Sequence, residues 1–319
     1  MATIEIAFVG MRTKTRSWLA LDAYFLFGSL LVGLLFSLAP LVLFAQASQS
    51  ARLRPSSASA PYSQRTSPLV KAPNGKTVAP DIARILQRGE LVVAMIAVDS
   101  PPFFAQKDGE HVGTDVDLAR QIAKELGVPV RFDRTAKTFD AAVEMAADGR
   151  ADLAMGRLAR TLARAQKVNF STSYMRLGHS FLINRLEFAK VSGANAAPRV
   201  IRNFTGKLGV IGGSAWEEFG RRNFPKAQIV LHTSWAKSVE AVKKGEVVAI
   251  YRDEFEIQQI MRGSPELALT LRTVTFNDLG SALSVMVGLT DVSLLTFVNE
   301  VIAQRTDIPV VANMLKELK

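Results

Sequence analysis

The sequence contains no cysteine and only three histidines. The lack of cysteine excludes a disulfide framework, a thiolate nucleophile and every site in which cysteine ligates zinc or an iron–sulfur cluster. His111, His179 and His232 lie far apart, so the sequence predicts no metal site, no histidine-based catalytic triad and no cofactor. The chain has 319 residues and is 48% hydrophobic, which is enough for one large domain or two modest ones.

Positive charge exceeds negative charge, but the excess is not spread along the chain. The net charge is +10. Residues 1–80 hold eight Lys or Arg against two Asp or Glu, whereas the other 239 residues hold 31 against 27. The excess therefore lies mainly beside a hydrophobic segment, which is typical of membrane topology rather than of groove binding. The sequence predicts no nucleic-acid partner.

The N-terminal region has the pattern of an export or anchoring signal. Three basic residues precede the segment 23–45, which is 23 residues long and carries no charge. A helix of about 20 apolar residues spans a bilayer core, and the length of this segment favours a retained anchor. The alternative is a cleaved signal peptide, because residues 45–47 form an A-x-A pattern and a proline precedes them.

Both alternatives give the same organisation of the N-terminal third. Because positive flanks stay in the cytoplasm, we expect residues 1–22 to be cytoplasmic and residues 23–47 to be a transmembrane anchor or signal sequence. Residues 48–80 are rich in Ser, Pro and Ala and predict a disordered linker. The folded part is expected in the periplasm, anchored to the inner membrane or secreted through it.

From residue 81 onward, segments typical of strands alternate with segments typical of helices. The expected strands are 90–98, 128–132, 151–155, 179–183, 207–211, 228–232 and 247–251. The expected helices are 114–127, 138–149, 214–224, 234–245, 253–263, 291–305 and 309–318. Two such runs, separated by the irregular segment 184–206, predict an α/β fold with two lobes, each with a parallel sheet covered by helices.

The position of a ligand site follows from this fold class. In open α/β sheets the ligand binds outside the carboxyl ends of the strands. Four loops are therefore expected to form the site. They are 99–104, 156–164, 212–216 and 252–254.

Six segments in this part of the chain carry a resemblance to a known family. They are "GELVVAMIAVDSPPF", "GTDVDLARQIAKELG", "FDAAVEMAADGRADLAM", "RTLARAQKVNFSTSY", "FTGKLGVIGGSAWEEF" and "VKKGEVVAIYRDE". In this order and spacing, the chain resembles the periplasmic polar-amino-acid-binding proteins of ABC importers, the family-3 extracellular solute-binding proteins, over nearly all of residues 81–319.

The resemblance implies a two-lobe periplasmic-binding-protein-like (type II) α/β fold. Each lobe would hold a mainly parallel sheet flanked by helices, and two hinge strands would join the lobes. Lobe 1 would comprise residues 81–184 and 286–319, and lobe 2 residues 185–285. The lobes would close on a small-molecule ligand, an amino acid or related carboxylate, and the partner would be an ABC permease.

The resemblance also implies roles for individual residues. Arg164, with Thr161 three residues earlier, falls where the family's arginine grips the ligand α-carboxylate with two parallel hydrogen bonds. Asp253 falls where the family's acid accepts the ligand α-ammonium. Gly213 and Ser214 match a Gly-Thr turn at a helix start, where backbone N–H groups and the helix dipole suit an anionic oxygen.

Aromatic positions of the family are kept only in part. Phe139 falls at an aromatic that stacks on the ligand side chain, with a core phenylalanine as the alternative. Phe103 closes the loop after the first strand and is expected to pack rather than to contact ligand. Ser100 stands where relatives often carry a second stacking aromatic.

Hydroxyl groups of the family's carboxylate site are missing. Gly156, Arg157 and Ala159 stand where the family has serines, and Ala215 replaces the second threonine of the turn. The backbone N–H groups of Gly156 and Ala159 remain as hydrogen-bond donors, although the side-chain hydroxyls are absent. Arg157 has two alternatives, contact with an acidic ligand side chain or a position in solvent or between the lobes, and we favour the second. These losses put the identity of the ligand in doubt.

The sequence thus predicts a solute receptor without catalytic residues. One alternative is a membrane-tethered sensor or partner-binding domain. Another is an enzyme resembling the dehydratases of prephenate and arogenate on the same fold. A dehydratase needs a positioned acid or base, and the loops offer only Asp253 and His232.

Overall fold

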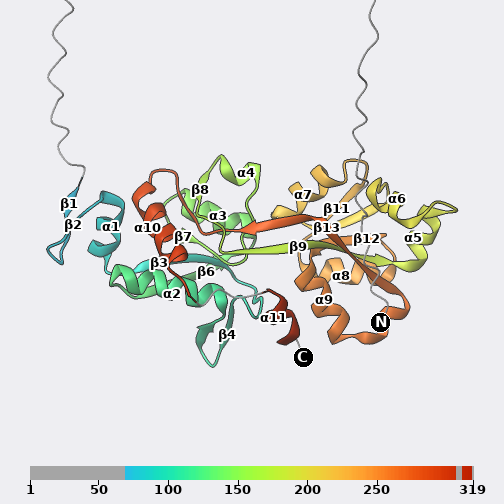
Figure 1. Cartoon of the computed structure of the whole chain (residues 1–319), viewed down its shortest axis with the longest axis horizontal. Coiled ribbons are helices and arrows are strands. Elements are labelled where there is room, and N and C mark those ends of the chain that lie inside the picture. The colour runs from blue at the N-terminus through green and yellow to red at the C-terminus, as the bar shows by residue number, and fades with distance from the viewer. Residues whose placement is uncertain (1–68, 307–310, 318–319) are drawn as a thin grey trace, which may run out of the picture. The chain divides into compact units, whose positions relative to one another are not determined.

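The structure is a computed structural model that describes residues 69–306 and 311–317 (Figure 1). The predicted cytoplasmic segment 1–22, the predicted anchor or signal 23–47 and most of the predicted linker lie outside the described residues. Among the described residues, the helices are all too short or too polar to cross a bilayer.

The last part of the predicted linker forms regular structure. Strands β1 (Val70–Lys71) and β2 (Thr77–Val78) pair antiparallel, and helix α1 (Pro80–Arg88) follows directly. The turn between the strands has Gly75 at a φ of 80°, and the Asn74 side chain accepts a hydrogen bond from the Lys76 amide. This Asn-Gly turn indicates a hairpin, although the overall composition of residues 48–80 is that of a linker.

The first lobe is built on a five-stranded sheet with the order β6-β3-β7-β14-β8. Its strands are β3 (Leu91–Ile96), β6 (Val130–Ala136), β7 (Leu153–Ala154), β8 (Val168–Phe170) and β14 (Met286–Gly288). Its helices are α2 (Thr114–Leu126), α3 (Phe139–Ala147), α4 (Leu162–Ala165) and α10 (Val292–Ala303). The last described helix, α11 (Val311–Glu317), contacts β9 and the helix at residues 254–263. A small hairpin, β4 (Ala105–Lys107) with β5 (Glu110–Val112), projects from the loop after β3.

The second lobe is built on a second five-stranded sheet, with the order β11-β10-β12-β9-β13. Its strands are β9 (Met175–Asn184), β10 (Lys207–Ile211), β11 (Gln228–His232), β12 (Ala249–Asp253) and β13 (Leu271–Leu283). Its helices are α5 (Arg185–Ser192), α6 (Ala197–Arg202), α7 (Ala215–Asn223), α8 (Trp235–Lys244), α9 (Glu254–Gly263) and a 3-10 turn (Pro265–Leu269).

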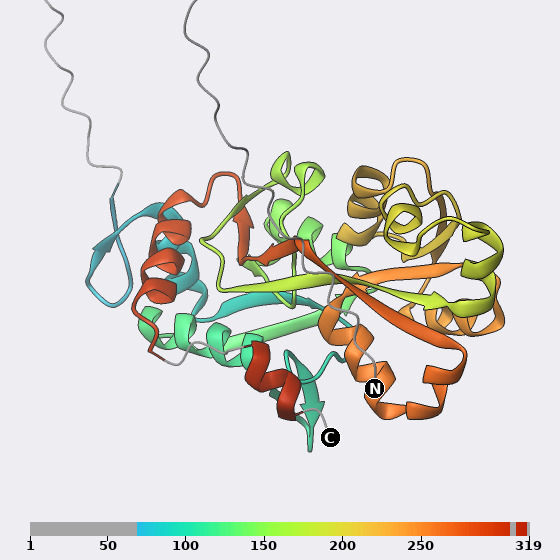
Figure 2. The same cartoon turned by 45° about the vertical axis from the view of Figure 1, so that its right-hand side comes forward.

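Two long strands connect the lobes. β9 and β13 pair antiparallel from Leu271 opposite Asn184 to Leu283 opposite Met175. In both views the two strands extend from the second sheet towards the first (Figures 1 and 2). There the chain joins β9 to β8 and β13 to β14. The two predicted hinge strands are therefore present. The residues 179–183 of β9 pair with β12 in the second sheet, and the exact lobe boundaries at 184 and 285 stay a prediction.

The alternation of strands and helices is confirmed, with two differences. Each sheet has two parallel pairings and two antiparallel ones, and the antiparallel pairings involve the hinge strands or the strands next to them in the chain. The segment 184–206 is not irregular but holds α5 and α6. Both are short, and α5 begins where the Asn184 side chain accepts a hydrogen bond from the Glu187 amide.

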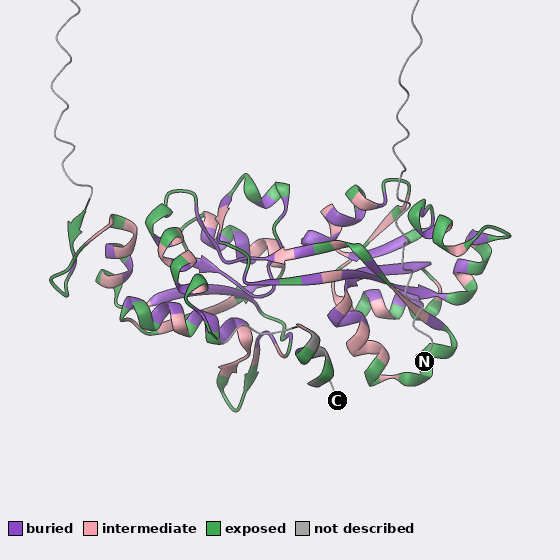
Figure 3. Cartoon of the chain, in the orientation of Figure 1, coloured by how far each residue is buried: buried purple, intermediate pink, exposed green. Residues whose placement is uncertain are grey.

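The core of each lobe lies between the sheet and its helices. The central strands β3 and β12 are buried at every position, as Figure 3 shows by its purple colour. Parallel strands covered on both faces read as continuous apolar runs, which is why the sequence identified them. Within β12 the apolar run ends in two charged residues, Arg252 and Asp253, and these lead to the site.

Candidate functional site

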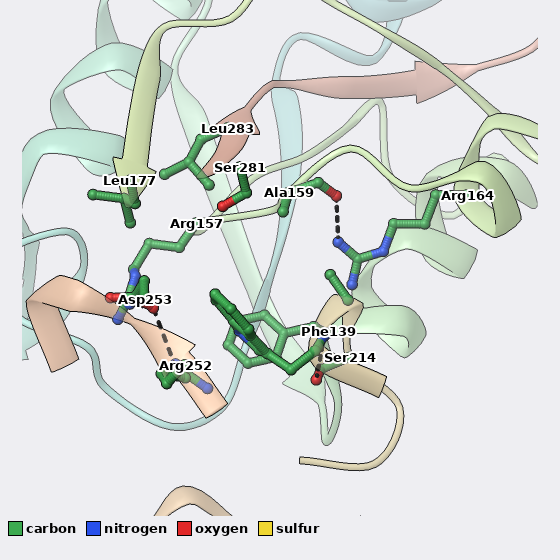
Figure 4. A pocket seen from close by; sticks show the side chains of 12 residues that line it. Phe139, Arg157, Ala159, Arg164, Leu177, Ser214, Arg252, Asp253, Ser281 and Leu283 are labelled. Atoms are coloured by element: carbon green, nitrogen blue, oxygen red, sulfur yellow. Dashed lines mark hydrogen bonds and ion pairs between the residues drawn. The ribbon is translucent and has the colours of Figure 1, made fainter. Parts of the chain in front are cut away.

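A small cleft lies where loops of the two lobes meet. Six of the predicted site residues line it (Figure 4): Phe139, Arg157, Ala159, Arg164, Ser214 and Asp253. They come from the loop after β7 and the short helix α4 that follows it, from the turn after β10, from the last residue of β12 and from the start of α3. The volume of the cavity is about 20 Å³, close to the space of one water molecule. Side chains of the protein therefore fill most of the cleft.

Arg157 is presented by a strained and firmly held loop. Its φ is 55°, in the left-handed region that few residues with side chains adopt, and Gly156 before it has a φ of 107°. The Arg157 amide donates a hydrogen bond of 2.7 Å to Asp115, and the Tyr174 hydroxyl donates one of 2.9 Å to the same oxygen. Asp115 is fully buried, and this burial raises its pKa to about 6. The buried carboxyl group fixes the loop and thereby the direction of Arg157.

The side chain of Arg157 reaches from the first lobe to the second. Its Nη2 lies 2.5 Å from Oδ2 of Asp253, and its Nη1 donates to Glu256 and to Ser100. The guanidinium lies 4.5 Å from the ring centre of Phe103. Burial alone would lower the pKa of Arg157, but the carboxylates of Asp253 and Glu256 raise it. Of the favoured alternatives for its side chain, a position between the lobes is observed and a position in solvent is wrong, because the side chain is 3% exposed and pairs with Asp253 of the other lobe.

Asp253 already has partners for both of its carboxylate oxygens. It is the last residue of β12 and the N-cap of α9, where Oδ1 accepts a hydrogen bond of 3.1 Å from the Glu256 amide. Oδ2 accepts the hydrogen bond from Arg157 and lies 3.3 Å from Nε of Arg252. Asp253, which was predicted to accept a ligand ammonium, is thus already paired with the guanidinium of Arg157.

Arg164 lies on the other side of the cleft (Figure 4). Its amide is capped by the Thr161 hydroxyl at the start of α4. Nε and Nη2 donate to Asp140 at 2.9 and 2.7 Å, and Nη1 donates to the carbonyl of Ala159 at 2.7 Å. A guanidinium has five N–H groups, so one remains on each terminal nitrogen. Burial lowers the pKa of Arg164, although the nearby carboxylate of Asp140 opposes this effect.

Arg252 is a cleft residue that the sequence analysis missed. It is 4% exposed and lines the cleft beside Asp253. Its guanidinium faces the rings of Trp235 at 5.2 Å and Phe139 at 5.6 Å, while burial lowers its pKa. The available signal was an arginine inside the apolar strand "VVAIYRD", where a buried charge needs a partner.

The turn at Gly213 and Ser214 in the second lobe makes a further contact with the first lobe. Ser214 caps α7, accepting from the Trp216 amide at 3.3 Å. The carbonyl of Gly213 accepts a hydrogen bond of 3.1 Å from the Asp140 amide at the start of α3. Gly213 has a φ of 65°, and a Cβ there would lie 3.2 Å from Thr138, so the close approach of the two lobes requires glycine.

A carboxylate of the second lobe also binds the first lobe. Glu218 on α7 accepts hydrogen bonds from the amides of Leu162 at 2.9 Å and Ala163 at 3.1 Å. These amides belong to the first turn of α4, where backbone N–H groups have no partner within the helix. The contact was not predicted, because the sequence gives no indication of which surfaces of the two lobes meet.

Three predicted residues lie behind the cleft rather than along it. Ser100 accepts from Arg157 and lies 3.3 Å from Glu256. Phe103 is fully buried and meets the edge of Phe255 at 5.0 Å, in agreement with its predicted packing role. Gly156 faces the ring of Phe104, which a Cβ would approach to 3.3 Å. These residues support Arg157 and the loops around it.

Among the described residues, no group of His, Cys, Asp or Glu side chains is arranged to hold a metal ion. Charge in the cleft is instead provided by arginines and carboxylates. Three guanidinium groups and one carboxylate line it: Arg157, Arg164, Arg252 and Asp253. Such a surface suits a small organic ion rather than a metal.

Known proteins resemble the chain in both sequence and fold. The family model described as bacterial extracellular solute-binding proteins, family 3, matches residues 91–305. The chain is 27% identical over 190 residues to a cyclohexadienyl dehydratase of Pseudomonas aeruginosa, covering 58% of this chain and 66% of the dehydratase, slightly less than two thirds. It is 24% identical over 202 residues to the L-cystine-binding protein TcyJ of Escherichia coli, covering 63% and 73%.

Solved structures agree with the two-lobe fold. An ancestral amino acid-binding protein, AncCDT-1, described as a precursor of cyclohexadienyl dehydratase, superposes with a TM-score of 0.56 at 27% identity, covering 74% of this chain and 96% of that one. A substrate-binding protein of an amino acid ABC transporter from Streptococcus pneumoniae, bound to L-arginine, gives 0.58 at 25% identity, covering 75% and 97%. The chain belongs to family 3 of the bacterial extracellular solute-binding proteins.

Proposed function

We propose that this protein is an extracytoplasmic receptor that captures a small carboxylate, an amino acid or a related acid, between its two lobes and delivers it to an ABC permease. One observation carries the proposal. Arg164 from the first lobe and Asp253 from the second, which the family resemblance assigns to ligand binding, line the same cleft. Relatives named for binding cystine, arginine and glutamine support the ligand class in general terms.

Closure would follow from contacts that only the closed state makes. The two spare N–H groups of Arg164 suit a carboxylate, and the capped start of α7 at Ser214 faces it from the other lobe. A ligand shifts an equilibrium between open and closed lobes only as far as it binds the closed state better. The hinge strands β9 and β13 would carry this movement.

Thermal unfolding with a panel of amino acids and organic acids tests the proposal. The purified full-length chain should gain thermal stability with one or a few of them, because a ligand that binds only the folded state stabilises it. Arg164→Ala should abolish the gain. Arg150→Ala is the matched control, since this arginine of the first lobe is exposed and pairs with Asp148 on the surface. An undiminished gain in Arg164→Ala would overturn the carboxylate assignment.

The position of the protein in the cell is part of the proposal. The family is extracellular, which supports a periplasmic or secreted folded part. We propose that residues 23–47 take it across the inner membrane, either as a retained anchor or as a cleaved signal. N-terminal sequencing of the exported protein separates the two. A membrane-tethered sensor would need the anchor to be retained, so a cleaved N-terminus would remove that alternative.

A dehydratase is the second candidate, because a named cyclohexadienyl dehydratase is among the similar proteins. Such an enzyme needs a group that can give or take a proton near the ligand. Besides Asp253, the cleft region offers Glu256, and burial would raise its pKa, but Arg157 and Arg252 lower it. A carboxylate held ionised in this way is a poor general acid. Formation of phenylpyruvate from prephenate by the purified protein would establish the enzyme instead.

A further inference from the structure

Several buried polar groups of the cleft that can donate a hydrogen bond have no partner in the described part of the chain. Nη1 of Arg252, Nε of Arg157 and the hydroxyl of Ser281 are buried and have no hydrogen-bond partner among the described residues. All three residues line the cleft. A buried donor without a partner costs on the order of 1–3 kcal/mol. These groups are therefore arranged for a ligand that accepts hydrogen bonds.

The acid that lines the cleft, Asp253, and its neighbour Glu256 are, by contrast, already hydrogen-bonded within the protein. Both oxygens of Asp253 accept hydrogen bonds, one from the Glu256 amide and one from Arg157. Glu256 accepts from Arg157 and Ser100. Each carboxylate oxygen can accept a second hydrogen bond, but the charge of Asp253 is already neutralised by Arg157. A ligand ammonium that formed the main ion pair with Asp253 would therefore have to displace the guanidinium of Arg157. Because Arg157 is tethered beside Asp253, its effective concentration there is on the order of millimolar or higher, and a free ligand competes poorly with it.

The charges around the cleft also favour an anionic ligand. The side chains of Arg157, Arg164 and Arg252 are 3–5% exposed, while the carboxylates of Asp253 and Glu256 are 3% and 11% exposed. Asp140, the partner of Arg164, is 43% exposed and shares its charge with solvent. Among the side chains that line the cleft itself, three carry a positive charge and one, Asp253, carries a negative charge. An anion reduces this excess of positive charge, whereas a zwitterion leaves it unchanged.

We propose that the ligand of this cleft is an organic carboxylate without an α-ammonium group, and that Arg157 excludes amino acids by occupying Asp253. The inference rests on the proposed receptor function. The carboxylate would accept hydrogen bonds from Arg164 and Arg252, whose guanidinium groups lie on opposite sides of the cleft (Figure 4). An added ammonium would meet two guanidinium groups beside an acid that is already paired, which is unfavourable for like charges in a buried site.

Matched pairs of ligands test this inference in the wild-type protein. Each pair has the same side chain and differs at the α-carbon, where the 2-oxo acid carries a carbonyl oxygen in place of the ammonium group: glutamate with 2-oxoglutarate, phenylalanine with phenylpyruvate, and leucine with 4-methyl-2-oxopentanoate. Isothermal titration of the full-length chain should show that the 2-oxo acid of at least one pair binds about tenfold or more tightly than its amino acid, a difference of about 1.4 kcal/mol.

A variant of Arg157 tests the mechanism. Arg157→Ser frees Asp253 and should reverse the preference towards the amino acid of the same pair. Arg160→Ser is the matched control, because Arg160 lies in the same segment but is exposed and faces Phe170. Wild-type protein that prefers amino acids overturns the inference and leaves the receptor function intact. Failure of every amino acid, every 2-oxo acid and every other acid in the thermal panel overturns the receptor function, and the inference with it.

Discussion

Arg157 and Asp253 lie on different lobes, and their charged groups meet at 2.5 Å across the cleft. Both side chains are almost fully buried, and Glu256 and Ser100 complete the hydrogen bonds around the guanidinium. The resemblance to the family implies that the arginine stands at the position of a small hydroxyl residue and the acid at the position that accepts a ligand ammonium. The pair joins the two lobes at the cleft.

Removal of Arg157 should destabilise the protein strongly. Arg157→Ala leaves Asp253 and Glu256 as buried charges without their main partner, and breaking such a pair costs about 3–5 kcal/mol. Adding Asp253→Asn and Glu256→Gln to Arg157→Ala removes the unpaired charges and should recover part of the loss. Chemical denaturation followed by circular dichroism measures both effects. A loss below about 1 kcal/mol in Arg157→Ala would show that the contact is weak.

Asp115 should give the protein a specific pH dependence. Burial raises its pKa from 3.8 to about 6 in the folded state, so the folded state holds a proton that the unfolded state has lost. Stability from this group is therefore present below about pH 4 and is lost as the pH rises through 6. The difference corresponds to about 3 kcal/mol.

Asp115→Asn isolates this effect. The amide oxygen of the substituted side chain is expected to keep the hydrogen bonds from the Arg157 amide and the Tyr174 hydroxyl, but an amide cannot ionise. Denaturation of both proteins between pH 4 and 7 should show the variant gaining stability over the wild type as the pH rises. Parallel pH profiles of the two proteins would mean that Asp115 keeps an ordinary pKa.

Glu218 should protect the start of α4 from solvent exchange. Its carboxylate accepts hydrogen bonds from the amides of Leu162 and Ala163 across the two lobes. In Glu218→Ala these two amides should exchange their hydrogens at least about tenfold faster, as expected when about 1.4 kcal/mol of protection is lost. Glu217→Ala is the control, because Glu217 pairs with Arg221 on the surface of the same helix. Equal exchange in the two variants would argue against the contact in solution.

The fold was largely predictable from the sequence because its central strands β3 and β12 are buried at every position. Continuous apolar runs predicted β10 and β11 at their observed bounds, and the serine before α7 predicted its cap. The helices α5 and α6 were missed because each is short and lacks a clear apolar period. The hairpin at residues 70–78 was missed because the composition of the surrounding segment is that of a linker.

The site was predictable only as a set of loops. The carboxyl ends of the strands identified where the lobes meet, and the resemblance selected Arg164 and Asp253. The ion pairs across the cleft could not be predicted, since Arg157 and Glu256 come from different lobes and no sequence spacing relates them. Arg252 was missed because an arginine at the end of an apolar strand usually reaches solvent, whereas here the strand is buried to its last residue.

A crystal structure with bound ligand tests the central claim most directly. The protein would be co-crystallised with the carboxylate that gives the largest thermal stabilisation. The account predicts the carboxylate oxygens within hydrogen-bond distance of Arg164, in the cleft between the lobes, with Arg157 still paired to Asp253. A ligand bound elsewhere, or an ammonium group in contact with Asp253 in place of Arg157, would contradict it.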